Sequence, residues 1–507
     1  MKKLRTFFKP LHNDILYEKN KLSIYNIIFL LVISFAAITV CSKSSPLYPM
    51  NNWDDANCFF TVGKSIMNGR TLYRDIFEQK GPLLYFIYSF AYLISEASFL
   101  GVYFIEIASC FMFMIFSAKI IMLFCEKRAI YYLPVIAAVI FGSAAFEQGG
   151  SAEELCLPLI ACGLYFGLKA ALYRKRLSYF QWFVTGAFSG MVLWIKFSLL
   201  GFYIGMGVFM LVYYFRNRWS KKILPSLFFL IAGEAAASLP VMIYFIMNDS
   251  VRYLFEVYFY CNIFVYPVND SGSGIISLIL NLNNGFGSFV WNFSACFLFM
   301  ALGTVYIFMR SKLLFAYYLS TSIFSFLLLY AGGRMYTYYS FILAVFVPMG
   351  FVMLYKTVQL LAEKKKKVLS RAIIYFSAAA VSVISFSFMV FISPNTYMIS
   401  YAKEELPQYK FNDIISQTED ASVLNYKFLD GGFYTVGRNV PEWRFFCGLN
   451  IPYLVSEQDK YIAEGKTDYI IACNKKYDFD RYECISSESF ESRKDSFNTY
   501  YLYKKIK

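Results

Sequence analysis

Long apolar runs recur along most of this chain, and they restrict its fold more than any other feature. From Leu22 to about Ser393, windows near or above the ~20 residues that cross a bilayer as a helix follow one another with short loops between them. Their length is that of spanning helices, not of barrel strands. A hydrophobic content of 58% and a mean hydropathy of +0.47 exclude a soluble globular protein of 507 residues. The sequence therefore predicts a polytopic α-helical membrane protein.

About eleven crossings are expected from these runs. The predicted spans are 22–41, 99–124, 130–146, 155–173, 180–195, 199–215, 223–247, 289–309, 313–330, 336–355 and 373–392. The apolar segment 82–95 is short for a crossing, and a crossing there would move every later basic cluster to the other side. We therefore predict an interfacial or re-entrant helix within an outer loop, 42–98.

Basic residues cluster in short loops at the predicted helix ends, and their placement predicts orientation. The net charge of +14 thus reports topology here, not nucleic-acid binding. With the N-terminus inside, most basic clusters fall in the cytoplasm, as the positive-inside rule prefers. The chain then begins with a basic cytoplasmic tail, 1–21, that leads into an uncleaved anchor. The membrane module covers 22–394, and 395–507 lies outside.

The chain changes character after Pro394 and becomes mostly polar. Three short segments, "ASVLNY", "TDYIIAC" and "TYYLYKK", have strand-like composition and are separated by helical or turn-like sequence. They predict a small extracytoplasmic α/β domain. No internal repeat is detected.

Cysteine and histidine give no sign of a metal site. The chain has eleven cysteines, but several lie inside apolar runs, where they act as small buried hydrophobes, and no C-x-x-C pair exists. The single histidine, His12, lies in the basic tail. Neither a zinc site nor a disulfide framework is indicated. No cofactor is predicted, although a divalent cation stays open.

Charged residues gather in the predicted outer segments. Pairing accounts for Arg70, Arg74 and Glu78. Lys196, between two apolar runs, must lie at the outer boundary or in a cavity, although snorkelling explains it as well. Arg334 follows two glycines at the outer end of another span, so these two cations suit a lipid phosphate. An interfacial aromatic belt equally explains the neighbouring tyrosines at 336, 338 and 339.

Two further pairs of charged residues lie at the start of a predicted span or within one. Glu153 and Glu154 begin a predicted span, where acidic residues favour the helix dipole. Glu106 and Lys119 lie within one span but too far apart to pair along one helix face, so they need other partners.

The first outer loop resembles that of the polytopic glycosyltransferases with the GT-C fold, specifically bacterial relatives of the protein O-mannosyltransferases and of the aminoarabinose transferase (glycosyltransferase family 39-like). The matching residues are Asp55, Gly63, Gly69, Tyr73, Asp75, Lys80, Gly81, Pro82 and Leu83. Further matches are "GGSAEE", "GMVLWIKFSLLG" and "GGRMYTYYSF". The resemblance covers roughly residues 20–350 and the order of the elements.

This resemblance implies inverting transfer of a sugar, a hexose or a pentose, from a polyprenyl-phosphate carrier to an acceptor on the outer face of a bacterial plasma membrane. Asp55 resembles the general base, with Asp54 as second choice. Lys196, Arg334 and Lys80 would bind the donor phosphate. The sugar or acceptor hydroxyls would contact Glu153, Glu154, Asp75, Tyr73 and Tyr339.

The chain departs from the family pattern at three places. Ala56 stands where many relatives have a glutamate. No basic residue follows the Pro-Leu helix until Lys119. A histidine near the late tyrosines is missing, so a histidine-ligated metal is not expected.

Two other classes of protein stay open as hypotheses. A transporter or lipid flippase for cell-envelope precursors would place ionisable residues deep in several spans and show repeat symmetry. A wall-binding or sensing tail on a membrane anchor would need far fewer spans. For the transferase, the acceptor stays open among cell-wall polysaccharide, teichoic acid, glycolipid and protein.

Overall fold

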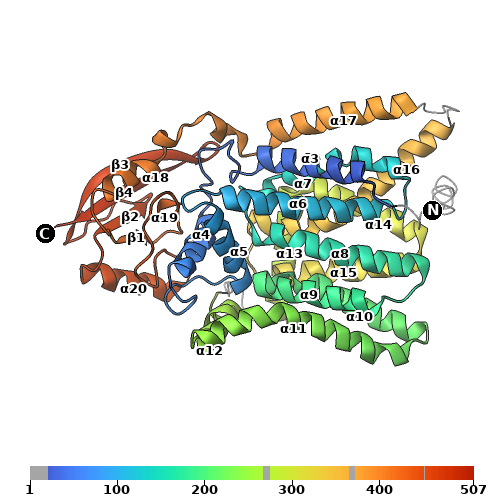
Figure 1. The fold of residues 1–507 in the computed structure, drawn as a ribbon, viewed down its shortest axis with the longest axis horizontal. Coiled ribbons are helices and arrows are strands. Elements are labelled where there is room, and N and C mark those ends of the chain that lie inside the picture. Colours follow the sequence, from blue (N-terminus) through green and yellow to red (C-terminus); the bar gives the residue numbers. More distant parts are fainter. Residues whose placement is uncertain (1–20, 267–273, 365–370, 450, 507) are drawn as a thin grey trace.

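The computed structural model describes residues 21–266, 274–364, 371–449 and 451–506. The molecule is elongated, with a helical bundle at one end and a small α/β region, which contains the C-terminus, at the other (Figure 1). Three segments lie wholly or partly outside the described residues. They are the predicted tail 1–21 with His12, except its last residue, the segment 267–273, and residues 365–367 of the basic run at 364–367.

The first part of the chain, up to Ile392, is helical. Its elements are α3 (Ile24–Cys41), α4 (Asp54–Met67), α5 (Pro82–Ile94), α6 (Leu100–Ile121), η1 (Lys127–Tyr132), α7 (Pro134–Phe141), η2 (Ala144–Phe146), α8 (Ala152–Tyr173), α9 (Tyr179–Lys196), η3 (Phe197–Leu200), α10 (Gly201–Arg216), η4 (Ser220–Lys222), α11 (Ile223–Met247), α12 (Val251–Tyr253), the π-helical η5 (Leu254–Val265), α13 (Ile275–Asn292), α14 (Ser294–Arg310), α15 (Lys312–Tyr330), η6 (Thr337–Phe346), α16 (Val347–Lys364) and α17 (Arg371–Ile392). Serine caps start three of the long helices, at Ser23, Ser151 and Ser178.

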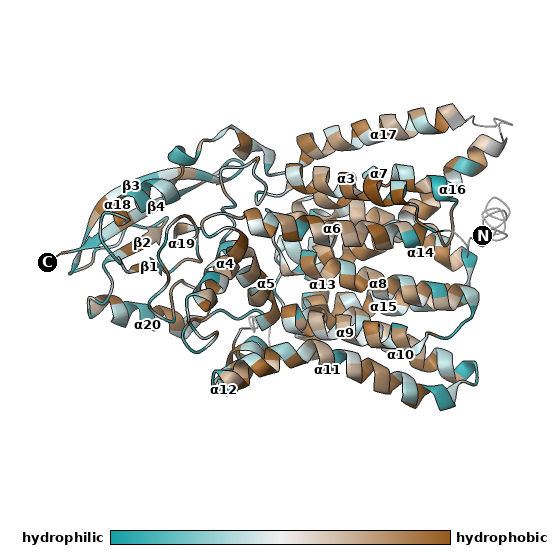
Figure 2. Ribbon diagram, in the orientation of Figure 1, coloured by the Kyte–Doolittle hydropathy of each residue, from teal (hydrophilic) through white to brown (hydrophobic). Residues whose placement is uncertain are grey.

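This chain is a multi-pass membrane protein, but the helices do not reproduce eleven separate crossings. Within the described residues, eight helical stretches are long and apolar enough to span a bilayer, or nine if the bent pair α13 and α14 counts as one span. That pair is bent by 105°. Figure 2 shows hydrophobic residues along the bundle helices and hydrophilic ones gathered in the C-terminal region and at the opposite end of the bundle.

Three segments explain the difference from the predicted count. The predicted spans 180–195 and 199–215 belong to one helical stretch, Tyr179–Arg216. This stretch folds back on itself, as the hydrogen bond from Trp182 Nε1 to Tyr214 OH at 3.0 Å shows. The predicted span 130–146 contains only the eight-residue α7, between 3-10 turns. Between the predicted spans 223–247 and 289–309, residues 251–265 are helical, and α13, which begins at Ile275, was not predicted as a separate helix.

Small residues let the bundle helices approach closely. A Cβ added to Gly186 of α9 would lie 1.9 Å from the carbonyl oxygen of Leu230 in α11, and one added to Gly233 of α11 would lie 2.0 Å from that of Phe183 in α9. Close backbone approach of this kind favours helix association in membranes through van der Waals packing, because the hydrophobic effect does not drive helices together in lipid.

The short apolar helix α5 lies at the junction between the bundle and the C-terminal region (Figure 1). It has 13 residues, begins with Pro82 at its first turn and packs against α4, α6 and α9. A helix of this length is too short to cross a bilayer.

The C-terminal region is a four-stranded sheet with helices on both faces. Its strands are β1 (Val423–Tyr426), β2 (Tyr469–Cys473), β3 (Tyr482–Arg493) and β4 (Ser496–Lys505), in the order β1-β2-β4-β3. Its helices are η7 (Thr396–Ser400), η8 (Lys403–Glu405), α18 (Pro407–Ile415), α19 (Phe433–Val436) and α20 (Pro452–Ala463). β1 and β2 are parallel, and the other pairs are antiparallel.

Alternate residues of β2 serve the two faces of this sheet. Ile471 packs with Phe411 of α18 and Phe433 of α19, whereas Ile470 packs with Ile462 of α20. The three predicted strands are present. β3 was missed because its sequence is rich in serine and glutamate, which are weak strand signals.

The C-terminal region docks on α4 through buried polar contacts. Thr61 Oγ1 donates to Asp430 Oδ2 at 2.5 Å, and Thr435 Oγ1 donates to Asn57 Oδ1 at 2.7 Å. Lys64 Nζ donates to the carbonyl oxygens of residues 434 and 437 at 3.0 and 2.6 Å. These contacts fix the orientation of α4 between the bundle and the sheet.

Candidate active site

The two aspartates at the start of α4 face different surroundings. Asn57, Thr61 and Lys64 form the side of α4 that faces the C-terminal region. At about 100° per residue, Asp55 lies roughly on the opposite side of the helix, whereas Asp54 lies on the same side as these three residues. Asp54 interacts electrostatically with groups of the sheet, namely Cys473 and Tyr500. Burial, and then the neighbouring charge of Asp55, raise the pKa of the Asp54 carboxyl to about 7.

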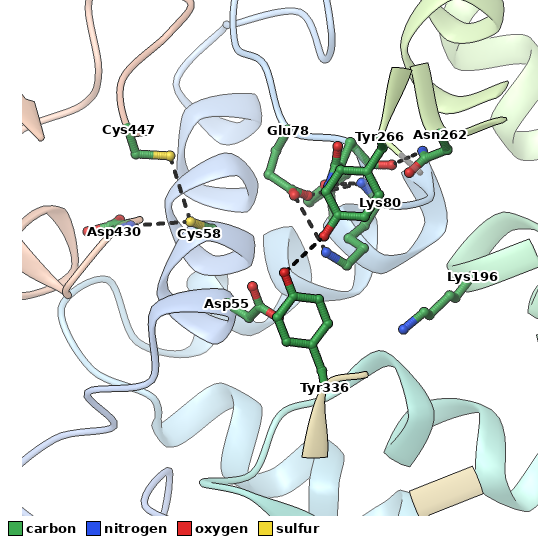
Figure 3. Close-up of polar contacts among 12 residues, drawn as sticks. Asp55, Cys58, Glu78, Lys80, Lys196, Asn262, Tyr266, Tyr336, Asp430 and Cys447 are labelled. Carbon is green, nitrogen blue, oxygen red and sulfur yellow. Dashed lines mark hydrogen bonds and ion pairs between the residues drawn. The ribbon is translucent and has the colours of Figure 1, made fainter. Parts of the chain in front are cut away.

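Asp55 instead faces a group of tyrosines. Tyr338 OH, on η6, donates to Asp55 Oδ2 at 2.5 Å. Tyr336 stacks on Tyr338, and its hydroxyl lies 3.3 Å from that of Tyr266. Figure 3 shows Asp55 on one helix with Cys58, with Lys80, Tyr266 and Tyr336 on one side and Cys447 and Asp430 on the other.

A cavity of about 460 Å³ lies beside this group. Its lining includes three of the predicted phosphate-binding cations and one predicted sugar-binding residue: Lys80, Lys196, Arg334 and Tyr339. The three cations come from segments more than 100 residues apart in the chain, so only the tertiary structure brings them together. The carboxylate of Asp55 interacts electrostatically with both Lys80 and Lys196.

Lys80 is held in place by its backbone and by carboxylates. Tyr73 OH donates to the Lys80 carbonyl oxygen, and the Lys80 amide donates to Glu78 Oε2 at 3.0 Å. Its ammonium lies 3.8 Å from Glu78 Oε1. Burial lowers the pKa of this ammonium, but the carboxylates of Glu78 and Asp55 outweigh burial and hold the pKa well above its ordinary value. Lys80 therefore stays a cation.

Lys196 and Arg334 both contact aromatic rings at the cavity wall. Lys196 Nζ lies 2.5 Å from Glu153 Oε1 and 3.7 Å from the ring centre of Tyr339. The Arg334 guanidinium lies 4.4 Å from the ring centre of Tyr266 and donates to its carbonyl oxygen at 2.9 Å. The ring contacts hold both cations in place, and Glu153 also pairs with the charge of Lys196.

Three buried polar atoms at or next to the cavity lining have no hydrogen-bond partner among the described residues. Two belong to lining residues, Gln79 Oε1 and Arg334 Nε, and the third is Oε2 of Glu153, which pairs with the lining residue Lys196. Buried polar groups are nearly always paired in native proteins, so unpaired ones around one cavity indicate groups available to a ligand.

Apart from Tyr339, the predicted sugar-binding or acceptor-binding residues do not line the cavity. Glu153 reaches it only through its ion pair with Lys196. Glu154 faces Glu106 and accepts from the Gly150 amide at 3.0 Å, while Ser42 Oγ donates to Glu106. Asp75 pairs with Arg74 at 2.9 Å at a partly exposed position. Tyr73 is fully buried and stacks on Phe245.

The structure adds Glu147, a carboxylate that the sequence did not single out. It is buried, and its interacting groups include the carboxylate of Asp55 and Arg493, the last residue of β3. Arg493 Nη2 lies 3.5 Å from Glu147 Oε2. Burial raises the pKa of Glu147, although Arg493 acts in the opposite direction. Its backbone φ of +55° is rare for a residue other than glycine.

Tyr338 was also missed, because the run "YTYYSF" is equally typical of an interfacial aromatic belt. Among the described residues, no group of three or more histidine, cysteine, aspartate or glutamate side chains is arranged to hold a metal ion.

Comparison with solved structures shows which fold this arrangement belongs to. ArnT from Cupriavidus metallidurans in the apo state superposes with a TM-score of 0.57 at 11% identity, covering 94% of this chain and 97% of that one. The same protein bound to undecaprenyl phosphate gives 0.53 at 13% identity with the same coverage. The chain has the GT-C fold. No family model and no curated protein matches the sequence.

At such low identity the likeness establishes the fold alone. The GT-C expectation from the first outer loop is therefore confirmed at the level of architecture, over nearly the whole chain rather than only residues 20–350. The roles of individual residues stay proposals.

Proposed function

We propose that the protein is a membrane glycosyltransferase that moves a sugar from a polyprenyl-phosphate carrier to a hydroxyl acceptor at the outer face of the membrane. The observation that carries this proposal is the cavity with three cations next to Asp55. Three cations around one cavity suit a phosphate, and the mostly apolar remainder of the lining suits the first part of a polyprenyl chain. A solved structure of the same fold was obtained with undecaprenyl phosphate bound.

In this mechanism Asp55 acts as the general base. It takes the proton from the acceptor hydroxyl as the acceptor oxygen bonds to the anomeric carbon, and the bond between that carbon and the phosphate oxygen breaks. The polyprenyl phosphate leaves with the bonding electrons, and one displacement inverts the anomeric configuration. Lys80, Lys196 and Arg334 would stabilise the charge that develops on the phosphate.

The tyrosine group has a positioning role in this proposal. Tyr338 would hold Asp55 toward the cavity through its hydrogen bond. Glu153 would orient Lys196, and its free oxygen atom would be available to a sugar hydroxyl. Glu147 is a second candidate for binding sugar or acceptor hydroxyls, because it lies near Asp55.

The proposed orientation places the cavity and the C-terminal region outside. Basic clusters such as those at residues 127–128, 174–176 and 310–312 then lie in the cytoplasm, in agreement with the positive-inside rule. The sugar and the acceptor stay open among the classes named above.

Transfer assays on purified protein test this proposal. The donors would be radiolabelled undecaprenyl-phosphate hexoses and pentoses, and membrane extracts would supply acceptors. We expect Asp55→Asn to lower transfer at least ~100-fold, because the base is lost, while binding of undecaprenyl phosphate persists. Glu96→Gln, at an exposed carboxylate between α5 and α6, is the matched control and should transfer at the wild-type rate.

Variants of the cations separate binding from chemistry. Lys196→Gln and Arg334→Gln should each weaken binding of undecaprenyl phosphate about 10-fold or more, since each removes a charge-assisted contact. Undiminished transfer by Asp55→Asn would exclude Asp55 as the base. Movement of lipid across vesicle membranes without any transfer would instead favour the flippase alternative.

A further inference from the structure

Two buried cysteines meet where α4 contacts the C-terminal region. Cys58 Sγ, on α4, lies 3.8 Å from Cys447 Sγ, and the two side chains are 1% and 2% exposed. The residues are 389 positions apart in the chain. Figure 3 draws this contact on the side of α4 that faces away from the Lys80 group.

Both sulfur atoms are held by their surroundings. The segment around Cys447 is fixed on either side, because the Asn425 amide donates to the Phe446 carbonyl and the Gly448 amide donates to that of Phe428. On the other side, the Asp430 amide donates to Cys58 Sγ at 3.4 Å. The contact is thus part of a well-packed interface rather than a chance approach of mobile side chains.

The two sulfur atoms are in van der Waals contact and are not bonded. Disulfide sulfurs are about 2.05 Å apart, so these two sulfur atoms, which lie 3.8 Å apart, must approach by about 1.8 Å to bond. The orientation proposed above puts this interface in the extracytoplasmic compartment, where disulfides form and persist. We propose that Cys58 and Cys447 are oxidised to a disulfide that joins α4 covalently to the C-terminal region.

The oxidation is a thiol–disulfide exchange. Each cysteine loses its proton, and the pair gives two electrons to the disulfide of an oxidoreductase or of a small-molecule thiol, which leaves as two thiols. A mixed disulfide on one cysteine is the intermediate, and the thiolate of the other resolves it.

Burial dictates when this exchange takes place. It raises the pKa of both thiols and shields them from an oxidant once the C-terminal region has docked. The bond therefore forms during maturation, before docking is complete, and is then protected from reductants. It keeps the helix that carries Asp55 fixed to the region that orients it.

Peptide mapping tests this inference without any activity measurement, so its outcome is independent of the proposed reaction. Full-length protein is purified without reductant, free thiols are blocked with N-ethylmaleimide in denaturant, and the digest is analysed by mass spectrometry with and without reduction. We expect a linked peptide pair containing Cys58 and Cys447 that disappears on reduction. The partly exposed Cys473 and Cys484 are internal controls and should be alkylated.

A thermal measurement provides the second readout. Reductant reaches the bond when the protein unfolds, so it should lower the unfolding midpoint of the wild type by several degrees, because the bond closes a loop that spans 389 positions. It should not change the midpoint of a Cys58→Ser, Cys447→Ser double variant. The proposal is overturned if both cysteines are still alkylated as free thiols after partly unfolded protein has been refolded with oxidised glutathione. Equal linkage of Cys473 or Cys484 to Cys58 would also overturn it.

Discussion

At the residue scale, the adjacent carboxylates of α4 differ because a helix turns by about 100° per residue. Asp55 is directed to the tyrosines and cations of the cavity, whereas Asp54 is directed to the sheet. An ionised carboxylate that is buried in an interface lowers the free energy of unfolding.

This difference predicts a pH effect for Asp54→Asn. The folded-state pKa of Asp54, about 7, lies above the value of about 3.8 expected for the unfolded chain, so the wild type loses stability as the pH rises from about 4 to 7. Replacement by asparagine removes that loss. The thermal unfolding midpoint of the variant, relative to the wild type, should therefore be higher at pH 8 than at pH 5.

Thermal scans in detergent over this pH range check the prediction. Asp413→Asn, at an exposed position on α18, is the control, because it removes a carboxylate that stays in water. A difference between Asp54→Asn and the wild type that does not change with pH would contradict the assigned environment.

At the element scale, the position of Lys80 depends on how closely α5 approaches the end of α9. The Gly81 amide donates to the Ile195 carbonyl at 3.1 Å, immediately before Lys196. A Cβ at Gly81 would lie 2.0 Å from the Trp194 carbonyl oxygen, a contact that no backbone tolerates without a shift. Gly81 thus lets two of the three cavity cations stand at one wall.

We expect Gly81→Ala to separate these cations and to weaken binding of undecaprenyl phosphate about 10-fold or more. The matched control is Gly207→Ala in α10, where an added Cβ meets nothing within 4 Å. Isothermal titration or a lipid-binding assay on both variants measures the effect. Wild-type affinity in Gly81→Ala would show that the backbone contact does not set the phosphate site.

At the scale of the whole molecule, the C-terminal region forms part of the support for the active site rather than an appendage. Asp430 accepts hydrogen bonds from Thr61 of α4, from Asn425 and from the Gly432 amide, and it is the nearby charge that favours the cation of Lys64. This network lies wholly inside the interface, where unpaired groups are costly.

Asp430→Ala should therefore lower both stability and transfer. The change leaves buried donors without acceptors and removes the charge facing Lys64, at a cost of about 3 kcal/mol or more. Chemical unfolding and the transfer assay measure the two effects. Asp413→Ala is the control for removing an exposed carboxylate, and full transfer by Asp430→Ala would mean that α4 keeps its place without the C-terminal contact.

The sequence alone was sufficient for what depends on local pattern. Apolar runs near the length of a bilayer predicted most of the helices, segments of strand-like composition predicted β1, β2 and β4, and the short apolar segment after Gly81 predicted α5. Lys196 and Arg334 stood out as rare polar residues at the ends of apolar runs. Asp55 and Lys80 were named through the resemblance of the first outer loop to the GT-C glycosyltransferases. Polar β3 and the bent α13 lacked such a pattern.

Only the tertiary structure decided which of these residues meet. Lys80, Lys196 and Arg334 line one cavity, Asp55 rather than Asp54 contacts Tyr338, and Glu154 faces Glu106. Hydrophobic periodicity sets the conformation of each segment, but contacts across 100 residues or more depend on how the packed helices are placed. That placement depends on close glycine contacts and on buried hydrogen bonds between distant segments, neither of which has a signature in the local sequence.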